Sequence, residues 1–361
     1  MESNYEEPVL LGEITVMKKN NIALFDSTAE EAKDFIHGLE SATGLQWEAK
    51  VLTANQGRKS KLANLLRYVK YFIFPFRIFL SRKKYGCIVG WQAFYGLLFA
   101  FYSRLFHVRK SNALLIKNFI YKPKKGWIGK IYYSFMRYIV KSEYVDVFVC
   151  SSENYCDYCA KMFDEPRERF VYIPFGVNDF TKIVDASKPA TNDYILALGR
   201  SNRDWDFLID AFTNTQYPLR IVCDELHREN LPENITIYNN VWQEESYQFI
   251  RNCKFMIIPI LDGKIVAGET VLLQAMSFSK PIVITKPSCL ADDYVTDGKT
   301  GIVVSKDRNE LLAAVKRLTE DGDFYTEISR NCRKLYEDKH SLYSFGINVG
   351  NALIRKDCLT R

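Results

Sequence analysis

Short apolar segments with the length of buried strands alternate with helical segments along this chain, and the alternation begins twice. In the first half, the predicted strands span residues 21–26, 87–90, 113–116 and 145–150. In the second half, they span residues 194–198, 219–223, 235–238, 255–259, 281–285 and 301–304. Helices are predicted between them, at residues 28–42, 93–106, 127–142, 205–212, 243–252 and 270–279. Alternation of this kind is typical of parallel sheets with helices on both faces.

The length of the chain favours two domains, because 361 residues exceed what one hydrophobic core usually organises. The alternation stops after residues 173–178, and the polar residues 181–193 indicate a linker. We therefore expect an α/β protein with two Rossmann-like domains facing each other across a cleft. The N-terminal domain is predicted at residues 1–178 and the C-terminal domain at residues 179–340. Ligands of such sheets bind outside the carboxyl ends of the strands.

Acidic residues are missing from one long segment of the N-terminal half. Between Glu48 and Glu143 there is no Asp or Glu, whereas residues 49–142 carry 20 Lys and Arg. Because the whole chain has a net charge of +6, the remainder carries −14. Such a strong segregation of charge indicates what a protein binds rather than how it folds. Anionic lipid, a pyrophosphate-linked substrate or nucleic acid would each suit this basic segment.

Two apolar stretches of the basic segment are too short to be membrane spans. Residues 71–80 include Pro75 and Arg77, residues 87–102 include Gln92, and a spanning helix needs about 20 apolar residues. We interpret residues 87–102 as a buried strand followed by a buried helix. Residues 61–85 alternate basic and aromatic side chains, which predicts a segment that lies at a membrane surface. The alternative is a core helix with a solvated basic face.

The cysteines and the N-terminus favour the cytoplasm. The first seven residues are acidic and do not have the form of a secretory signal. Nine cysteines, an odd number scattered along the chain, suit free thiols in a reducing compartment. Cys156 and Cys159 have the spacing of a metal or redox pair, but no second such pair and no histidine cluster accompanies them. Ordinary buried cysteines are the alternative, and no metal site is expected.

Two loops of the C-terminal half have the composition of a phosphate site. Ala267 and Gly268 lead into an apolar helix, so free backbone N–H groups and the positive end of the helix would meet there. Glycine lets a ligand approach the backbone closely. Arg200 and Arg203 follow a strand and Gly199, and their guanidinium groups can bind the same phosphates. A solvated loop is the alternative for both arginines.

These segments resemble the retaining glycosyltransferases of family four, which have the two-domain GT-B fold. Residues 257–283 are similar to the donor-binding signature of that family, and Asp297–Gly301 to its "DGxxG" turn. Residues 198–205 resemble its diphosphate-binding loop, and Ile173–Val177 its "IPNGV" segment. The resemblance is strong over residues 145–305 and weaker before them. It also implies that residues 341–361 form a helix that packs back on the N-terminal domain.

The resemblance implies roles for residues of the C-terminal domain, namely catalysis by Arg200, Arg203 and Glu269 and donor binding by Gly199, Gly268, Thr270 and Gln274. The family usually carries two glutamates eight positions apart. Here Gln274 and Val266 occupy those positions. Gln274 can still hydrogen-bond a ribose hydroxyl. Glu269 would either reach the donor sugar or cap the helix that it begins.

The acceptor side is predicted at strand ends of the N-terminal domain. Many members of the family carry a histidine there, whereas the corresponding stretch, Leu115–Phe119, has none. We expect Lys117 or Asn118 to serve in its place, together with Trp91 and Gln92 at the end of another strand. A purely structural role is the alternative for these four residues.

The function implied by the resemblance is sugar transfer with retention, without a metal ion or cofactor, from a UDP- or GDP-sugar to a lipid-linked or oligosaccharide acceptor. In such enzymes the departing phosphate helps to deprotonate the acceptor hydroxyl, so no pair of catalytic carboxylates is needed. The basic domain would bind an anionic membrane surface, which predicts a cytoplasmic protein on the inner face of the membrane. Nucleic acid is not an expected partner, because no nucleic-acid-binding motif is found. The alternative is a catalytically silent protein that binds nucleotide sugar or acts as a scaffold.

Overall fold

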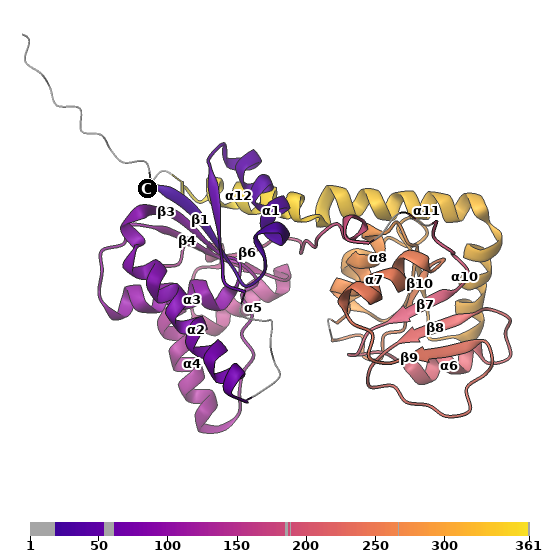
Figure 1. Cartoon of the computed structure of the whole chain (residues 1–361). Helices are drawn as coiled ribbons and strands as arrows, with labels where there is room; N and C mark the ends of the chain where they lie inside the picture. The colour runs from indigo at the N-terminus through magenta and orange to yellow at the C-terminus, as the bar shows by residue number, and fades with distance from the viewer. Residues whose placement is uncertain (1–18, 54–60, 185–186, 188, 266, 360–361) are drawn as a thin grey trace, which may run out of the picture. The chain divides into compact units, whose positions relative to one another are not determined.

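The computed structural model describes residues 19–53, 61–184, 187, 189–265 and 267–359. The acidic N-terminus and Val266 therefore lie outside the described residues. The chain forms two compact units. The N-terminal unit comprises residues up to Ala29, Gly44–Val171 and residues from Leu353 onward, and the C-terminal unit comprises Glu30–Thr43 and Tyr172–Ala352. Each unit is built around one sheet of six strands (Figure 1).

The N-terminal sheet consists of β1 (Asn20–Phe25), β2 (Trp47–Val51), β3 (Tyr85–Gly90), β4 (Ala113–Ile116), β5 (Val147–Cys150) and β6 (Phe170–Tyr172). Its strand order is β2-β1-β3-β4-β5-β6, and the pairs from β2 to β5 are parallel. Strands β4 and β5 are buried along their whole length, as expected for a sheet covered on both faces. The chain order reverses between β1 and β3, and open sheets of this kind usually bind their ligands outside the carboxyl ends of the strands at such a point.

Three helices form one layer against this sheet: α2 (Lys61–Leu80), α3 (Ala93–Leu105) and α4 (Gly126–Val140). Figure 1 shows them on one side of the N-terminal sheet. Helix α3 lies between the other two, and aromatic rings join it to both. The Phe76 and Tyr102 rings are 5.1 Å apart, and the Phe101 and Phe135 rings are 5.2 Å apart. The apolar stretch at residues 87–102 is thus β3 followed by a largely buried α3.

None of the helices in the described ranges is long and apolar enough to cross a bilayer. Helix α5 (Glu153–Phe163) follows β5 and completes the helices that lie wholly within the N-terminal unit. Its buried side chains, Cys156, Cys159 and Phe163, face the interior of the unit.

The C-terminal sheet consists of β7 (Ile195–Leu198), β8 (Leu219–Val222), β9 (Ile235–Tyr238), β10 (Met256–Ile258), β11 (Ile282–Thr285) and β12 (Ile302–Val304). Its order is β12-β11-β10-β7-β8-β9, with parallel pairs throughout. The order reverses between β7 and β10. The accompanying helices are α6 (Trp205–Phe212), α7 (Gln243–Asn252), α8 (Glu269–Ser277), α9 (Cys289–Tyr294), α10 (Arg308–Glu320) and α11 (Gly322–Leu335).

Two further helices cross with their backbones almost in contact. Helix α1 (Ala29–Thr43) meets α12 (Leu342–Arg355) at Gly38 and Gly346. A methyl group built on Gly38 would lie 2.1 Å from the Tyr343 carbonyl oxygen, and one built on Gly346 would lie 2.3 Å from the Phe35 carbonyl oxygen. Only glycine fits at either position.

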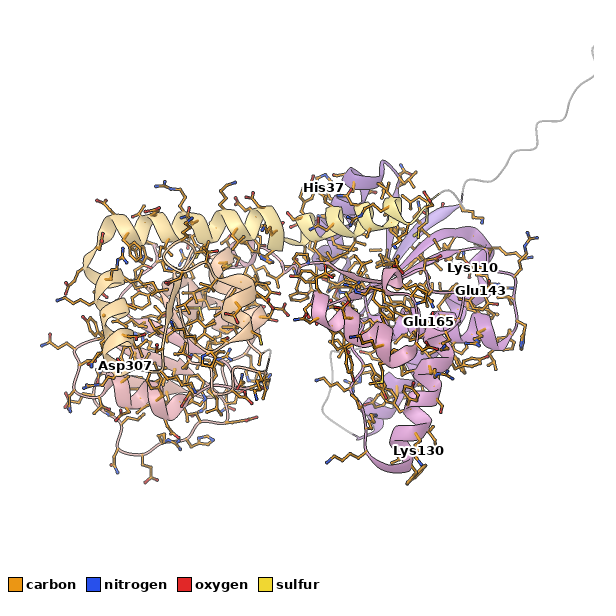
Figure 2. The ribbon with its side chains drawn as sticks, turned by 180° about the vertical axis from the view of Figure 1, so that it is seen from behind. His37, Lys110, Lys130, Glu143, Glu165 and Asp307 are labelled. Carbon is orange, nitrogen blue, oxygen red and sulfur yellow. The ribbon has the colours of Figure 1, made fainter. Side chains whose placement is uncertain are left out.

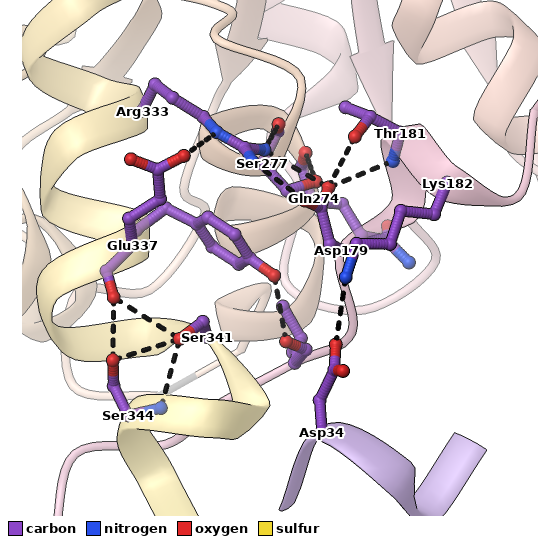
Figure 3. A network of polar contacts seen from close by, with 12 residues as sticks. Asp34, Asp179, Thr181, Lys182, Gln274, Ser277, Arg333, Glu337, Ser341 and Ser344 are labelled. Carbon is purple, nitrogen blue, oxygen red and sulfur yellow. Dashed lines mark hydrogen bonds and ion pairs between the residues drawn. The ribbon is translucent and has the colours of Figure 1, made fainter. Parts of the chain in front are cut away.

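An arginine connects α11 with the segment that follows β6. Arg333 donates from Nη2 to Asp179 Oδ2 at 2.7 Å and from Nη1 to Asp179 Oδ1 at 3.1 Å, and it also binds Glu337 and the Ser277 carbonyl (Figure 3). Burial opposes ionisation of Asp179, but the hydrogen bonds from Arg333 and Thr181 outweigh it and lower the pKa of this carboxyl. The ion pair thereby fixes residues 179–181 beneath α8.

The predicted class, an α/β protein with two Rossmann-like domains, is confirmed by the two parallel sheets. The cleft between the domains, and the domain limits at residues 1–178, 179–340 and 341–361, stay a prediction.

Candidate active site

Two loops meet at the point where the strand order of the C-terminal sheet reverses. The loop after β7 runs from Gly199 to Asp204, and the loop after β10 runs from Pro259 to Gly268. Asn202 links them, because its side chain donates to the Asp262 carbonyl at 2.9 Å and accepts from the Asp262 N–H at 2.8 Å. The Asp204 N–H donates to the Pro259 carbonyl at 2.8 Å. Both predicted phosphate loops therefore border one site.

Arg203 is the buried cation of this site, with 6% of its surface exposed. Its guanidinium donates to three backbone carbonyls, those of Leu198 at 3.4 Å, Ser201 at 2.9 Å and Ala267 at 3.4 Å. Within the described ranges no carboxylate forms an ion pair with it. Burial lowers the pKa of Arg203 to about 10, so the group stays protonated at neutral pH but lacks a counter-charge. An anionic ligand would supply one.

Two glycines make room for this guanidinium. A methyl group built on Gly268 would lie 2.4 Å from Arg203 Nη2, and one built on Gly199 would lie 2.9 Å from the same atom. Both glycines have positive φ, 104° and 139°. The sequence therefore needs glycine at both positions for two reasons, the left-handed backbone and the space for Arg203.

The first turn of α8 points its N–H groups into the same site. Gly268 is the N-cap residue, and no side chain caps the helix. The exposed Thr270 lies in this first turn, and Gln274 is buried one turn further on. Uncapped amides at the N-terminus of a helix attract anions. The combination of these amides with Arg203 is suited to binding a diphosphate.

Glu269 makes a contact that the sequence did not predict. Tyr294, in α9, donates its hydroxyl to the Glu269 carboxylate. Burial raises the pKa of Tyr294, and the charge of Glu269 raises it further. The ring of His340 lies 5.1 Å from that of Tyr294, and burial lowers the pKa of this imidazole. Glu269 is thus held by Tyr294, which comes from later in the chain.

The segment resembling "IPNGV" shapes the surroundings of His340. The Phe175 carbonyl lies 3.0 Å from His340 Nδ1, and the Val177 N–H donates to the His340 carbonyl at 2.9 Å. A methyl group on Gly176 would lie 2.6 Å from the Phe345 side chain. Glycine is therefore required where this segment crosses the start of α12.

Arg200 does not join Arg203. Its side chain is 67% exposed, and its nearest carboxylate is Asp224, with Nη1 and Oδ2 3.9 Å apart. Asp224 follows β8, whereas Arg203 lies toward β10. The structure thus brings together Gly199, Arg203, Gly268 and the start of α8, and it leaves Arg200 at the periphery.

The predicted acceptor residues lie at the carboxyl ends of β3 and β4 in the N-terminal sheet. Gln92 Nε2 donates to Asp26 Oδ2 at 2.7 Å, which joins the ends of β3 and β1. The Trp91 ring stacks on Phe25 with centroids 4.8 Å apart, and Lys117 Nζ lies 3.3 Å from the Trp91 ring centre. Lys117 is 4% exposed.

Asn118, next to Lys117 in the chain, adopts a left-handed backbone with φ of 51°. Phe25 and Asp26 were missed by sequence reasoning, although a polar residue directly after the first strand was a usable signal. Carboxylate, amide and ammonium groups beside an aromatic ring are the usual partners of sugar hydroxyls and sugar faces.

The Cys156–Cys159 pair adjoins a third thiol. Cys150, Cys156 and Cys159 are all buried, and hydrogen bonds with the other two raise the pKa of Cys150. All nine cysteines are free. Among the described residues, no group of three or more His, Cys, Asp or Glu is arranged to hold a metal ion.

Comparison with protein families gives one match, and it covers the domain that holds Arg203. Residues 192–321 match the family described as "Glycosyl transferases group 1". No curated protein sequence matches the chain.

Solved structures share the fold over nearly the whole chain at low identity. Anabaena Alr3699/HepE in complex with UDP is 14% identical, with a TM-score of 0.59 over 93% of this chain and 100% of that one. Sucrose-phosphate synthase from Thermosynechococcus elongatus is 13% identical, with a TM-score of 0.59 over 95% and 100% of the two chains. WaaG, a glycosyltransferase involved in lipopolysaccharide biosynthesis, is 13% identical, with a TM-score of 0.53 over 91% and 98%.

Proposed function

We propose that this chain, whose residues 192–321 form a glycosyl transferases group 1 domain, transfers a sugar from a nucleotide-diphosphate donor to a glycan acceptor with retention of configuration. The proposal depends chiefly on Arg203. Its guanidinium is buried, has no carboxylate partner in the described ranges, and lies beside the uncapped start of α8. A diphosphate would satisfy both at once. UDP is the first donor nucleotide to test, because a structural neighbour binds it, and GDP is the second.

The proposed reaction needs positive charge where the leaving group forms. As the bond between the sugar and the phosphate breaks, negative charge grows on the nucleoside diphosphate, and Arg203 with the α8 amides would stabilise it. Because these groups are already in place, we propose that no divalent cation is required. The new bond forms to an acceptor oxygen on the same face of the sugar, and its proton passes to the departing phosphate. Gln274 would bind a ribose hydroxyl.

Glu269 and Thr270 are proposed to contact the donor sugar from the start of α8. The hydrogen bond from Tyr294 orients the Glu269 carboxylate, which then has one oxygen fixed. Arg200, being exposed, would act only on the outer part of the diphosphate. Acceptor recognition is assigned to Trp91, Gln92, Lys117 and Asn118, with Asp26 as the carboxylate that holds Gln92.

We further propose that the acceptor is linked to lipid and that the N-terminal unit docks on an anionic membrane. Helix α2 exposes Val69, Ile73 and Leu80 at 46%, 44% and 62%. The start of α4 exposes Trp127 and Ile131 at 71% and 60%. Exposed cations accompany both sets: Lys70, Arg77, Lys124, Lys125 and Lys130. Apolar side chains among cations are typical of an interfacial surface.

Replacing Trp127 by serine is expected to weaken binding to anionic vesicles by about tenfold, because the variant no longer buries an indole ring in the apolar part of the bilayer. The measurement is vesicle co-sedimentation with the full chain. Trp242 provides a matched control, because it is 70% exposed but lies in the C-terminal unit. Equal binding of the Trp127→Ser variant and the wild type would remove α4 from the docking surface.

A catalytically silent protein that binds nucleotide sugar is the second candidate. It is favoured by Gln274, which stands where the family usually has a glutamate. Hydrolysis or transfer of a donor sugar by the wild type, absent from an Arg203 variant, would exclude the silent alternative.

The experiment that tests the donor site is a thermal-shift screen with UDP, GDP, ADP and common sugar conjugates, with and without magnesium. A ligand at about 100 times its dissociation constant stabilises the folded state by about 2.7 kcal/mol. We expect one uridine or guanosine diphosphate to stabilise the protein equally in both conditions. If no nucleotide stabilises it, the donor site is wrong. If stabilisation needs magnesium, the proposed metal independence is wrong.

A further inference from the structure

A basic hollow lies at the end of the N-terminal sheet opposite to the carboxyl ends of its strands. It has a volume of about 760 Å³ and is lined by Lys19, Arg82, Lys83, Phe106, His107, Val108, Arg109, Lys110, Ser111 and Asn112. These residues precede β1, β3 and β4, so the hollow faces the amino ends of the strands. Trp91, Gln92 and Lys117 follow β3 and β4, at the carboxyl ends. The hollow is therefore distinct from the proposed active site.

The walls of the hollow are held by buried contacts. Asn112, which is 6% exposed, donates to the Arg82 carbonyl at 2.8 Å and to the Tyr85 carbonyl at 2.6 Å. The rings of Phe79 and Phe106 stack with centroids 5.5 Å apart. Lys110 donates to Asp146 at 2.8 Å, and it lies beside Glu143, far from Lys130 at the start of α4 (Figure 2). The loop of residues 106–112 is thus fixed in place.

Most cations around this hollow have no counter-charge. No lining residue is acidic, and Lys110 is paired with Asp146. Within the described part of the chain, Lys19, Arg82, Lys83 and Arg109 form no ion pair. Lys83 and Arg109 are exposed. Such a group of cations suits a phosphate that carries more than one negative charge, because a phosphate monoester at neutral pH has a charge of about −1.5 to −2.

The chain next to the lining residues carries exposed apolar side chains at the ends of α2 and α3, here called the apolar rim. Leu80, Leu105 and Phe106 are 62%, 47% and 55% exposed. Of these three side chains only Phe106 has a ring on which a base could stack, whereas a single strand is usually bound by stacking successive bases on several rings. A concave site of this size fits a headgroup better than a strand. Acyl chains, by contrast, would cover this rim while the phosphate entered the hollow.

We propose that this hollow binds the phosphomonoester headgroup of an anionic membrane lipid. Arg109 and Lys83 contact the phosphate, Arg109 through its planar fork and Lys83 as a point charge. The apolar rim of Leu80, Leu105 and Phe106 lies among the acyl chains. The proposal rests on the membrane docking proposed above, but not on sugar transfer. Diffuse charge would attract any anionic membrane, whereas this hollow would also select lipids with one kind of headgroup.

The test compares two vesicle types of equal surface charge, phosphatidylcholine with phosphatidic acid and phosphatidylcholine with phosphatidylglycerol. The pocket variant is Lys83→Gln/Arg109→Gln. The control is Lys122→Gln/Lys125→Gln, which removes the same charge from exposed positions before α4. We expect the wild type to bind phosphatidic acid about tenfold more tightly than phosphatidylglycerol, and only the pocket variant to lose this preference. Both variants should weaken binding to phosphatidylglycerol equally.

Three outcomes would overturn the proposal. The first is an equal effect of both variants on both vesicle types, which would mean diffuse attraction only. The second is stabilisation by free inorganic phosphate in the wild type but not in the pocket variant, without a lipid preference. The third is loss of RNA binding in the pocket variant alone. Nucleotide-induced stabilisation of the pocket variant should equal that of the wild type, so failure of this site and failure of the donor site are distinguishable.

Discussion

Replacement of Arg203 by glutamine should abolish stabilisation by the donor nucleotide while changing the free energy of unfolding of the free protein by less than about 1.5 kcal/mol. Nucleotide binding is expected to change much more than the free energy of unfolding, because Arg203 is buried without a counter-charge. Burial lowers its pKa to about 10, which means that the folded protein holds this cation at a cost in stability below that pH. Removing the charge relieves that cost. The loss of bonds to the carbonyls of Leu198, Ser201 and Ala267 opposes the gain.

The expected loss of activity is large. One preorganised donor to a developing negative charge typically contributes about 10² to 10³ in kcat, or about 2.7–4 kcal/mol. Arg200→Gln is the matched control, because it removes the same charge from a side chain that is 67% exposed. We expect its effect on kcat to be below about tenfold, since an exposed charge acts through solvent.

Measurements of the free and the donor-bound protein decide between binding and structural roles of Arg203. Denaturant unfolding of the free variant gives its stability, and thermal shift with the nucleotide gives its binding. If Arg203→Gln loses more than about 3 kcal/mol of stability but still binds the nucleotide, its role is structural. If Arg200→Gln has the larger effect on turnover, the assignment of the two arginines is reversed.

Much of the fold could be predicted because its strands are short, apolar and clearly bounded. Residues 113–116 and 235–238 form strands with the predicted limits, and residues 205–212 and 243–252 form helices with the predicted limits. Strand β2 was not predicted. It is an edge strand in which only Trp47 is buried, so its residues carry little hydrophobic pattern. Helix α5 was not predicted either, because its many polar side chains and few buried ones also leave little hydrophobic pattern.

The site could be predicted in part, because the phosphate loops are local in sequence. Gly199, Arg203 and Gly268 lie together because the loops after β7 and β10 start from neighbouring strands of the sheet. The direction of Arg200 was not predictable, since it depends on Asp224 after the neighbouring strand. The contact of Glu269 with Tyr294 joins residues 25 positions apart, and that of Gln92 with Asp26 joins residues 66 apart. Such contacts follow from strand order, which no local pattern contains.

Replacement of Gly38 by alanine should destabilise the protein by about 3 kcal/mol or more, because the new methyl group would lie 2.1 Å from the Tyr343 carbonyl oxygen. A flexible side chain could move aside, but a helix backbone can yield only if α1 and α12 separate. Separation would open the contact between the Phe35 and Phe345 rings, whose centroids are 5.7 Å apart. Both rings are fully buried, so their apolar surface would be lost from the core.

Gly346 is the position on α12 that faces Gly38 at this crossing. Its methyl group would lie 2.3 Å from the Phe35 carbonyl oxygen at the same crossing, so Gly346→Ala alone should cost as much as Gly38→Ala. The double variant should cost clearly less than the sum, because one separation of the helices relieves both clashes. Gly322→Ala is the control: nothing lies within 4 Å of its new methyl group, and alanine at the start of α11 should be neutral or slightly stabilising. Urea unfolding of the four variants measures these differences, and full additivity would mean that the two glycines do not share one contact.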